Sequence, residues 1–341
     1  MSKLILVTGG TGYIGSHTCI ELMNEGFEVL IADNLSNSDI SVLDGIEKTS
    51  GKRPFFEKVD LSDETSTNLL FDKYPGIVAI IHFAAYKAVG ESVSIPLKYY
   101  YNNLNSLIHL LNNMERKKVS NIVFSSSCTV YGEPDELPVT EKAPIKPASS
   151  PYGNTKQICE EILRDTGAVN ENLNIISLRY FNPVGAHPSA NIGELPLGVP
   201  NNLVPFITQT AIGLRDELKV FGSDYNTPDG TAIRDYINVV DLAKAHVIAI
   251  KRLLGKAGKK KLEVFNLGTG RGVSVLEVIN AFEKASGVKL KYKIVDRREG
   301  DVEKVFADTR FANTELGWKA EKNLEETLAS AWKWEKKIRN K

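Results

Sequence analysis

A glycine-rich segment near the start of the chain places the strongest constraint on the fold. Leu4–Val7 is a short, continuous apolar run, which is typical of a strand buried on both faces of a parallel sheet. Three glycines follow, Gly9, Gly12 and Gly15, and a helical pattern begins at their end. Glycines let backbone N–H groups approach a diphosphate closely, and the positive end of the helix faces it. The segment therefore predicts a dinucleotide-binding turn.

A second strand pattern supports this prediction, because Glu28–Asp33 ends in a carboxylate. Asp33 lies about twenty residues after the glycines, where an acid can bind the ribose hydroxyls. A carboxylate at this place repels a 2′-phosphate, so the expected cofactor is NAD and not NADP. A glycine turn without a ligand is the structural alternative.

The composition excludes several classes of protein. The 341 residues include 42 Lys plus Arg and 42 Asp plus Glu, so the net charge gives no reason to expect nucleic acid or an anionic membrane as a partner. The three cysteines, Cys19, Cys128 and Cys159, have neither a disulfide pattern nor the spacing of metal ligands. Since no apolar stretch approaches the roughly twenty residues that cross a bilayer, we expect a soluble, cytoplasmic enzyme without a metal.

Strand and helix patterns alternate along the first half of the chain, which predicts an α/β fold with a doubly wound parallel (Rossmann) sheet. Further strands are expected at 55–59, 77–83, 122–124 and 175–181, and helices at 40–48, 64–73, 96–118 and from Pro151 onward. We expect the Rossmann domain at 1–181, with segments near 235–267 as candidates to rejoin it. A smaller α/β substrate domain is expected at 182–341, where the proline- and glycine-rich segment 182–202 is expected to wrap a ligand and not a core.

Three residues form the strongest candidate for catalysis. Ser127 ends a predicted strand, and Tyr152 and Lys156 lie one turn apart on the helix that follows. A free tyrosine titrates near ~10, which makes it a poor base at neutral pH. A neighbouring ammonium and the positive nicotinamide of NAD⁺ would stabilise the phenolate, and the serine hydroxyl could share the substrate proton. The alternative is that Tyr152 and Lys156 only share an exposed helix face.

These motifs resemble the extended short-chain dehydrogenases, and over nearly its whole length the chain is similar to the UDP-glucose 4-epimerases among them. Eight strings carry the resemblance: Gly9–His17, Asp33–Ser38, His82–Ala85, Lys87–Ser92, Arg179–His187, Pro200–Leu203, Asp229–Tyr236 and Arg297–Asp301. Several of them are long and distinctive, and together they are far more specific than the glycine triplet.

The resemblance implies a tightly held NAD and a UDP-sugar substrate, residue by residue. The implied cofactor-binding residues are Gly9, Gly12, Tyr13, Ile14, Gly15, Asp33, Asn34, Asn37, Ser38, Asp60, Leu61, Phe83, Ala84, Ala85, Lys87, Asn102, Tyr152, Lys156 and Phe181. The implied substrate-binding residues are Ser127, Tyr152, Asn182, Asn202, Arg234, Arg298, Asp301 and Val305. Of these, Arg234 and Arg298 suit the UDP phosphates, because a guanidinium offers paired donors in a fixed plane.

The resemblance also implies an isomerase with a defined mechanism. Tyr152 would take the proton of the sugar 4-hydroxyl while the 4-hydrogen leaves as a hydride. The flat 4-keto sugar would then turn about its phosphate link and take the hydride back on its other face. A homodimer that pairs through long helices such as 96–118 is a further implication.

Alternatives remain for the chemistry. A sugar-nucleotide 4,6-dehydratase shares the fold, the NAD and the first oxidation, but it places an acidic pair directly after the serine or threonine. Cys128 and Thr129 stand there in this chain, and neither can do that work. A non-catalytic dinucleotide-sensing protein would not need the Tyr152–Lys156 pair. A net reductase would need an exchangeable cofactor, usually NADPH, which Asp33 disfavours.

Val305 bears on the breadth of substrates. In the family, the residue four beyond the aspartate of the Arg-x-Gly-Asp string limits the sugar pocket, and a tyrosine there excludes an N-acetyl group. Val305 occupies that place in this chain, and it lacks the tyrosine ring. The resemblance therefore implies that N-acetylated UDP-sugars are accepted as well, unless neighbours such as Phe306 fill the space.

Overall fold

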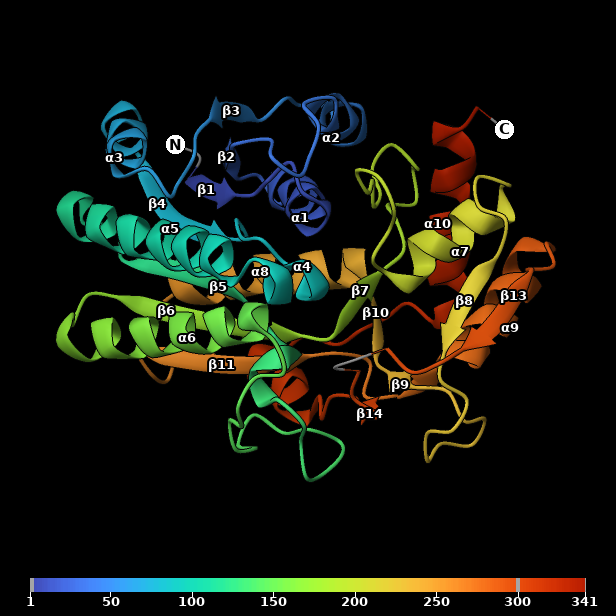
Figure 1. Ribbon diagram of the computed structural model, residues 1–341. Helices are drawn as coiled ribbons and strands as arrows, with labels where there is room; N and C mark the ends of the chain where they lie inside the picture. The colour runs from blue at the N-terminus through green and yellow to red at the C-terminus, as the bar shows by residue number, and fades with distance from the viewer. Residues whose placement is uncertain (1–2, 299–300, 341) are drawn as a thin grey trace.

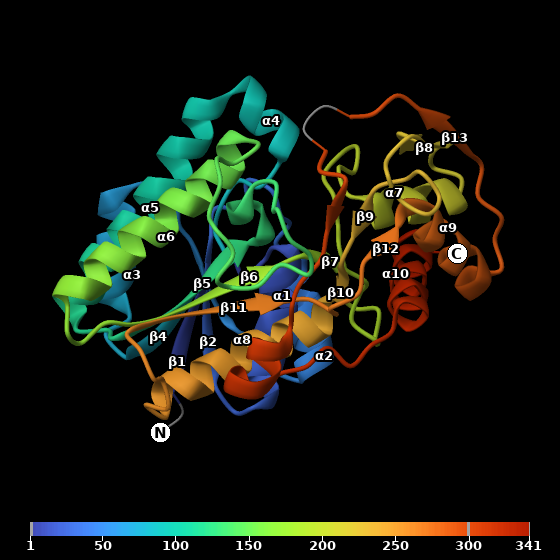
Figure 2. The same cartoon turned by 90° about the horizontal axis from the view of Figure 1, so that it is seen from below.

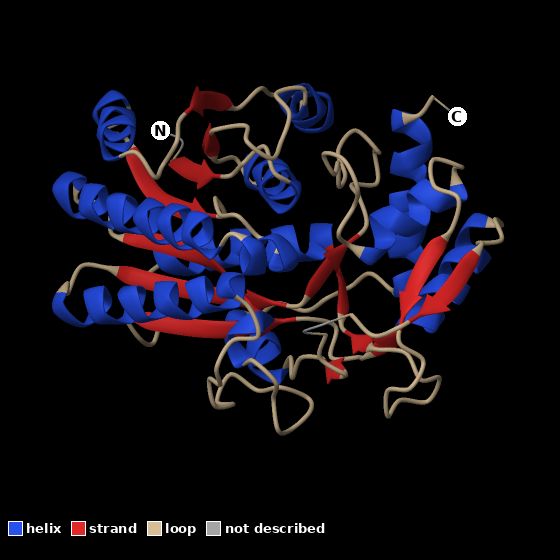
Figure 3. Cartoon of the chain, in the orientation of Figure 1, coloured by secondary structure: helices blue, strands red, loops and turns tan. Residues whose placement is uncertain are grey.

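We describe the chain from a computed structural model that covers residues 3–298 and 301–340. One seven-stranded sheet dominates the molecule, and all of its strands run parallel (Figures 1 and 3). The strands follow the order β11-β6-β5-β4-β1-β2-β3. Their bounds are β1 Leu4–Thr8, β2 Glu28–Asp33, β3 Phe55–Lys58, β4 Ile77–His82, β5 Asn121–Ser127, β6 Asn174–Tyr180 and β11 Leu262–Leu267. This arrangement confirms the predicted doubly wound α/β fold.

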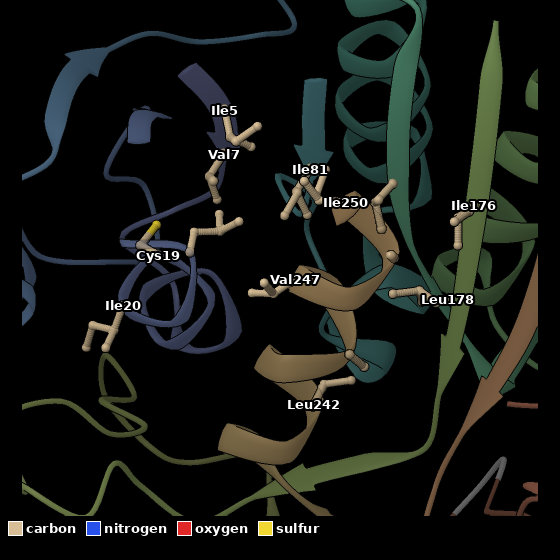
Figure 4. Close-up of a cluster of buried hydrophobic side chains, with 14 of the residues drawn as sticks. Ile5, Val7, Cys19, Ile20, Ile81, Ile176, Leu178, Leu242, Val247 and Ile250 are labelled. Atoms are coloured by element: carbon tan, nitrogen blue, oxygen red, sulfur yellow. The ribbon is translucent and has the colours of Figure 1, made fainter. Parts of the chain in front are cut away.

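Helices cover both faces of this sheet. One face packs on α1 (Tyr13–Asn24), α2 (Val42–Ser50) and α8 (Val239–Leu254), and the other on α3 (Glu64–Lys73), α5 (Pro96–Lys117) and α6 (Pro151–Val169). Alternate residues of each strand enter opposite cores: Ile5 and Val7 pack with α1 and α8, as Figure 4 shows, whereas Leu6 packs on the other side. The inner strands are thus buried on both faces, which explains their continuous apolar runs, whereas Phe55 on the edge strand β3 is 51% exposed.

A smaller part of the molecule lies beyond the carboxyl ends of these strands (Figure 2). Its helices are α7 (Leu203–Ala211), α9 (Val275–Ser286) and α10 (Leu324–Ile338). Its strands form three small sheets: β8 (Leu218–Phe221) with β13 (Tyr292–Val295), β7 (Asn182–Val184) with β10 (Tyr236–Asn238), and β9 (Ile233–Arg234) between β12 (Val273–Ser274) and β14 (Lys304–Val305). The helices α9 and α10 each begin with a capping box, Ser274 with Glu277 and Asn323 with Glu326.

The chain passes between the two parts more than once. After β10 it returns along α8 and forms β11, which pairs with β6 at the edge of the large sheet. After β11 the chain crosses back to the small part. The first strand, β1, therefore lies in the large part and the last helix, α10, in the small part (Figure 1). We call these parts the cofactor half and the substrate half. The division of the chain into two domains at residue 181 remains a prediction.

Some elements differ from expectation. No bounds were predicted for the short strands β7–β10 and β12–β14 or for the helix α4 (Val89–Ser94), and a short 3₁₀ turn, Cys128–Tyr131, follows β5. The segment 182–202 was expected to carry no core, but Val184, Ala186, Ala190 and Ile192 are buried. Their spacing follows neither strand nor helix, because turns fold them inward. Within the described residues, no helix is both long and apolar enough to span a membrane.

Candidate active site

The glycine turn between β1 and α1 is shaped by close packing. Gly9 adopts a left-handed φ of +69°, and a Cβ on it would lie 2.8 Å from the amide nitrogen of Ala84. A Cβ on Gly15 would lie 2.3 Å from the carbonyl oxygen of Gly9. Any side chain at these places would push the turn away from β4 or from α1. Because Gly12 offers α1 no side-chain cap, the first N–H groups of the helix fit an anionic ligand.

Asp33 lies against this turn, at the carboxyl end of β2. One carboxylate oxygen accepts from the backbone N–H of Thr11 at 3.3 Å, and the other accepts from the N–H of Leu35 at 2.9 Å and from the hydroxyl of Ser38 at 3.3 Å. Asp33 therefore joins the glycine turn to the loop after β2. In the same region Asn34 donates to Asp60 at 3.4 Å, so Asp33, Asn34, Ser38 and Asp60, four of the expected cofactor-binding residues, lie in one region of the structure.

The segment after β4 closes the other side of the turn. Phe83 and Ala84 donate backbone N–H groups to the carbonyl and hydroxyl of Thr8, at 3.1 and 3.3 Å. The sequence implied Asn102 as a contact here, and Asn102 donates to Asn103 at 2.9 Å.

Asn103, which the sequence did not single out, makes the wider connections. Its side chain accepts from the N–H of Tyr86 at 2.9 Å, and it donates to the carbonyl of Tyr86 and to the hydroxyl of Thr155 on α6, both at 3.0 Å. Asn103 is almost fully buried, so these bonds join the cofactor segment to the helix that carries Tyr152 and Lys156.

Ser127, Tyr152 and Lys156 come together at the carboxyl end of β5. Lys156 is buried, donates to the carbonyl oxygen of Ser125 at 2.7 Å and lies 4.8 Å from the ring centre of Phe124. Burial lowers its pKa to about 8. Burial also raises the pKa of Tyr152 above its ordinary value, although a hydrogen bond with Ser127 opposes this effect. In the protein alone, burial thus opposes the phenolate form of Tyr152, and the hydrogen bond with Ser127 favours it.

A buried ion pair fixes α6 from behind, and the sequence analysis did not find it. Glu160 forms two hydrogen bonds with Arg179 on β6, at 2.9 and 2.5 Å, and also accepts from Ser126 at 2.6 Å and Ser177 at 2.9 Å. Burial would raise the pKa of Glu160, but these donors hold it below its ordinary value. Glu160 lies one turn beyond Lys156, so the pair sets the helix against β5 and β6.

The arginines expected at the substrate lie together in the substrate half. Arg298 contacts Asp301 at 2.6 Å, and Arg234 on β9 lies 3.6 Å from the same carboxylate. Asn202 is placed differently: it precedes α7 and donates to Glu194 at 2.6 Å. Burial raises the pKa of Glu194. Asn182 begins β7, where its N–H donates to the carbonyl of Asp235 at 3.0 Å.

Val305 lies in an apolar cluster that includes Val130 and Tyr131 of the 3₁₀ turn after Ser127. The buried members of this cluster are Val130, Tyr131, Val139, Phe181, Val305 and Ala307, and Cys128 packs against them. Val305 is 8% exposed, so its side chain is part of this buried apolar cluster. Cys128 and Thr129, the two residues after Ser127, supply no carboxylate.

Comparison with known proteins agrees with this geometry. A profile of the family described as GDP-mannose 4,6 dehydratase matches residues 6–331. The UDP-glucose 4-epimerase of Bacillus subtilis is 51% identical over 97% of this chain and 96% of its own. The structure of the Stenotrophomonas maltophila enzyme, with NAD and formylated UDP-arabinopyranose, is 48% identical, with a TM-score of 0.95 over 99% of both chains. The Bifidobacterium longum enzyme, with NAD⁺ and UDP, is 47% identical, with the same TM-score and coverage.

The fold and the site define an NAD-dependent enzyme of the extended short-chain dehydrogenase class that acts on nucleotide sugars. The profile alone names a dehydratase, but the relatives that match over nearly the full length at about 50% identity are epimerases. The chain belongs to the UDP-glucose 4-epimerase family, and it is an isomerase.

Proposed function

We propose that this chain interconverts UDP-galactose and UDP-glucose with Tyr152 as the acid–base residue. The observation that carries this proposal is the cluster of Ser127, Tyr152 and Lys156, in which Ser127 and Lys156 are buried and which lies at the same sheet edge as the glycine turn. The carboxyl ends of parallel strands are where such folds bind ligands. A cofactor at the turn and a sugar at the cluster would therefore be neighbours.

The glycine turn fits NAD, because Gly9 and Gly15 leave the space that a Cβ would fill and α1 begins there without a side-chain cap. Asp33 would hold the adenosine ribose, and Lys156 the nicotinamide ribose. When bound, NAD supplies the hydride acceptor and donor as well as a positive charge beside the phenol.

Tyr152 then performs the proton transfer at the sugar 4-hydroxyl. The hydrogen bond with Ser127 already favours the phenolate, and the ammonium of Lys156 lies one helical turn away. Inversion at C4 requires the flat 4-keto sugar to present both of its faces in turn. The protein must therefore hold UDP firmly and the sugar loosely, with Arg234 and Arg298 at the phosphates.

The direct test incubates the purified protein with UDP-galactose and no added cofactor. We expect UDP-glucose to form, and NAD⁺ with NADH to be recovered from the denatured protein. A preparation that works only after NADP⁺ is added contradicts the proposal. Release of a 4-keto-6-deoxy sugar would favour the dehydratase instead.

The substrate range extends, in this proposal, to UDP-N-acetylglucosamine and UDP-N-acetylgalactosamine. Val305 stands where a tyrosine would fill the pocket, and the wall around it consists of apolar side chains without a charge. Both pairs of sugars should be compared on the wild type, on Val305→Tyr and on the near-isosteric control Val305→Thr. Val305→Tyr should lose only the N-acetyl activity, and absence of that activity in the wild type ends the idea.

A homodimer through α5 completes the proposal. Leu97 and Tyr101 are 80% and 64% exposed and lie one turn apart, and Val93 and Ile95 beside them are exposed too. A second copy of this face would cover the apolar stripe with an isologous contact. Sedimentation should give a dimer for the wild type and a monomer for Leu97→Glu/Tyr101→Glu. We also place the enzyme in a reducing cytoplasm, which suits its three free cysteines.

A further inference from the structure

The segment Asp301–Asp308, which we call the strap, brings substrate residues to the site with little regular structure to support them. It begins with the carboxylate that contacts Arg234 and Arg298, and it carries Val305. Its strand, β14, has only two residues, Lys304 and Val305. Something other than a strand ladder must therefore fix the strap.

Asp235 supplies that support from beneath. It lies between β9 and β10 and is fully buried, and four donors occupy its carboxylate. One oxygen accepts from the N–H of Thr269 at 2.8 Å and from its hydroxyl at 2.7 Å. The other accepts from the N–H of Gly270 at 3.1 Å and from the N–H of Ala307 in the strap at 3.2 Å. The carboxylate thus ties the strap to the turn after β11.

The contact is close as well as polar. A Cβ on Gly268 would lie 2.4 Å from the second oxygen of Asp235 and 2.8 Å from the Cβ of Ala307. Across the described residues, no Lys or Arg forms an ion pair with Asp235, so its charge is balanced by backbone dipoles and one hydroxyl. Burying a carboxylate in this way is costly, and burial raises its pKa.

Backbone hydrogen bonds with Val139 form a second connection to the strap. Val139 donates to the carbonyl of Phe306 at 2.9 Å and accepts from the N–H of Asp308 at 2.8 Å. Asn266 donates to the carbonyl of Val139 at 2.9 Å and accepts from the hydroxyl of Tyr131 at 2.6 Å. Tyr131 ends the 3₁₀ turn Cys128–Tyr131, which begins directly after Ser127, so this second set of hydrogen bonds positions the strap relative to that turn.

We propose that Asp235 is a positioning residue that sets the depth of the sugar pocket, by holding the strap and Val305 against the Cys128–Tyr131 turn. This inference rests on the proposed function, since it requires that the sugar lie beside Val305. In this inference Asp235 acts through the strap, because the donors to its carboxylate belong to Thr269, Gly270 and Ala307.

The test replaces one carboxylate oxygen by an amide. In Asp235→Asn the NH₂ group must face two donors, either the N–H and the hydroxyl of Thr269 or the N–H groups of Gly270 and Ala307, so the hydrogen bonds on one side are lost. The matched control is Asp308→Asn, on the same strap, where the carboxylate binds Arg310 instead. We compare kcat/KM for UDP-galactose with kcat/KM for UDP-N-acetylgalactosamine, and we measure the Kd of UDP and the NAD content.

Asp235→Asn should shift the ratio of the two kcat/KM values by about tenfold towards the larger sugar, which is the effect expected for one hydrogen bond to a charged group. The Kd of UDP and the NAD content should stay at their wild-type values, and Asp308→Asn should leave the ratio unchanged. A merely structural role would lower both rates together and leave the ratio where it was, which overturns the inference.

Two further outcomes keep the test decisive. If Asp235→Asn does not fold, Thr269→Val removes one donor and should shift the ratio in the same direction by a smaller factor; an unchanged ratio in Thr269→Val overturns the inference. A wild type that fails to epimerise UDP-galactose refutes the proposed function and, with it, the basis of this inference. Activity on UDP-galactose with an unaltered ratio in the variants refutes the inference alone.

Discussion

Different kinds of interaction stabilise the cofactor half and the substrate half internally. In the cofactor half, strands of four to seven residues form one continuous parallel ladder. In the substrate half the strands have two to four residues and are divided among three sheets. There the side chain of Asp235 replaces part of the missing ladder by accepting from the backbone N–H groups of Gly270 and Ala307.

This difference separates two demands on the enzyme. A dinucleotide site needs a fixed geometry, and a ladder of main-chain hydrogen bonds provides it largely independently of the side chains. A sugar pocket differs between substrates, and a wall held by a few side chains can be altered without disturbing the large sheet. The substrate half should therefore tolerate changes of specificity that the cofactor half would not.

The largest effect on turnover should come from a change at Tyr152, which acts between the cofactor and the sugar. Tyr152→Phe should lower kcat by about 100- to 10,000-fold, because it removes the proton transfer and little else. UDP affinity and NAD content should stay close to the wild type. Tyr180→Phe is the control, since Tyr180 is also a buried phenol and hydrogen-bonds to Ser125. Removing that neutral hydrogen bond should cost at most about tenfold in kcat; a larger loss than in Tyr152→Phe would assign the base to Tyr180.

A mirrored pair of variants tests whether the halves bind independently. Arg234→Gln should weaken UDP binding by about 10- to 100-fold through the loss of a charged donor, with the NAD content unchanged. Asp33→Asn should weaken NAD retention by about tenfold, with the Kd of UDP unchanged. Titration calorimetry with UDP and an assay of released NAD measure both effects. If either variant weakens the binding of UDP and of NAD equally, the two halves do not bind their ligands independently.

Acid should weaken the cofactor half in particular. His17 on α1, His82 on β4 and His246 on α8 are buried, and burial lowers their pKa values to about 3, 3 and 4. The unfolded chain binds these protons near pH 6.5 and the folded chain does not, so stability falls as the pH drops below 6.5 towards 4. Each histidine should lower the free energy of unfolding by about 1.4 kcal/mol for each pH unit of acidification in that range.

His246→Met tests this contribution, because Met nearly matches the volume of histidine and does not titrate. The free energy of unfolding, measured in urea between pH 7.5 and 4.5, should fall less steeply for the variant than for the wild type. Hydrogen exchange should show the large sheet losing protection before α9 and α10. Equal slopes for the two proteins would contradict the expectation.

The smallest effect concerns a contact that joins the halves. The hydroxyl of Tyr13, at the start of α1, donates to the carbonyl of Gly185 at 2.6 Å. Tyr13→Phe should lower the free energy of unfolding by about 1 kcal/mol and speed the loss of NAD, since α1 and the segment after β7 are no longer tied. Tyr74→Phe, which removes a hydroxyl that binds Glu57 far from this contact, should leave NAD loss unchanged. Identical NAD loss in all three proteins would show that the tie is unimportant.

The same difference explains how far the sequence could predict the fold. The inner strands of the large sheet are buried on both faces, so apolar runs such as Ile77–His82 can be recognised in the sequence, and α3 begins and ends at its expected residues. The strand β8 pairs with β13, more than seventy residues later, and β9 has only two residues. Elements so short carry no periodicity, and their stability comes from distant side chains.

The candidate site divides in the same way. The glycines, Asp33 and the Tyr152–Lys156 pair were predictable because their spacing along the chain reflects one turn or one helix. Glu160 was missed because its partner Arg179 lies nineteen residues away on another strand. Asp235 stands inside a string that the resemblance had marked, but its partners, Thr269 and Ala307, are 34 and 72 residues distant. A carboxylate that binds backbone N–H groups leaves no pattern of complementary residue types to detect.

The path of the chain also places its two ends on different halves of the molecule. The chain starts in the large sheet at β1 and finishes with α10, in the substrate half (Figure 1). A donor fluorophore placed before β1 and an acceptor placed after α10 would therefore sit on different halves. Energy transfer between them would read out any hinge motion that accompanies ligand binding, in real time and without a mutation in either half.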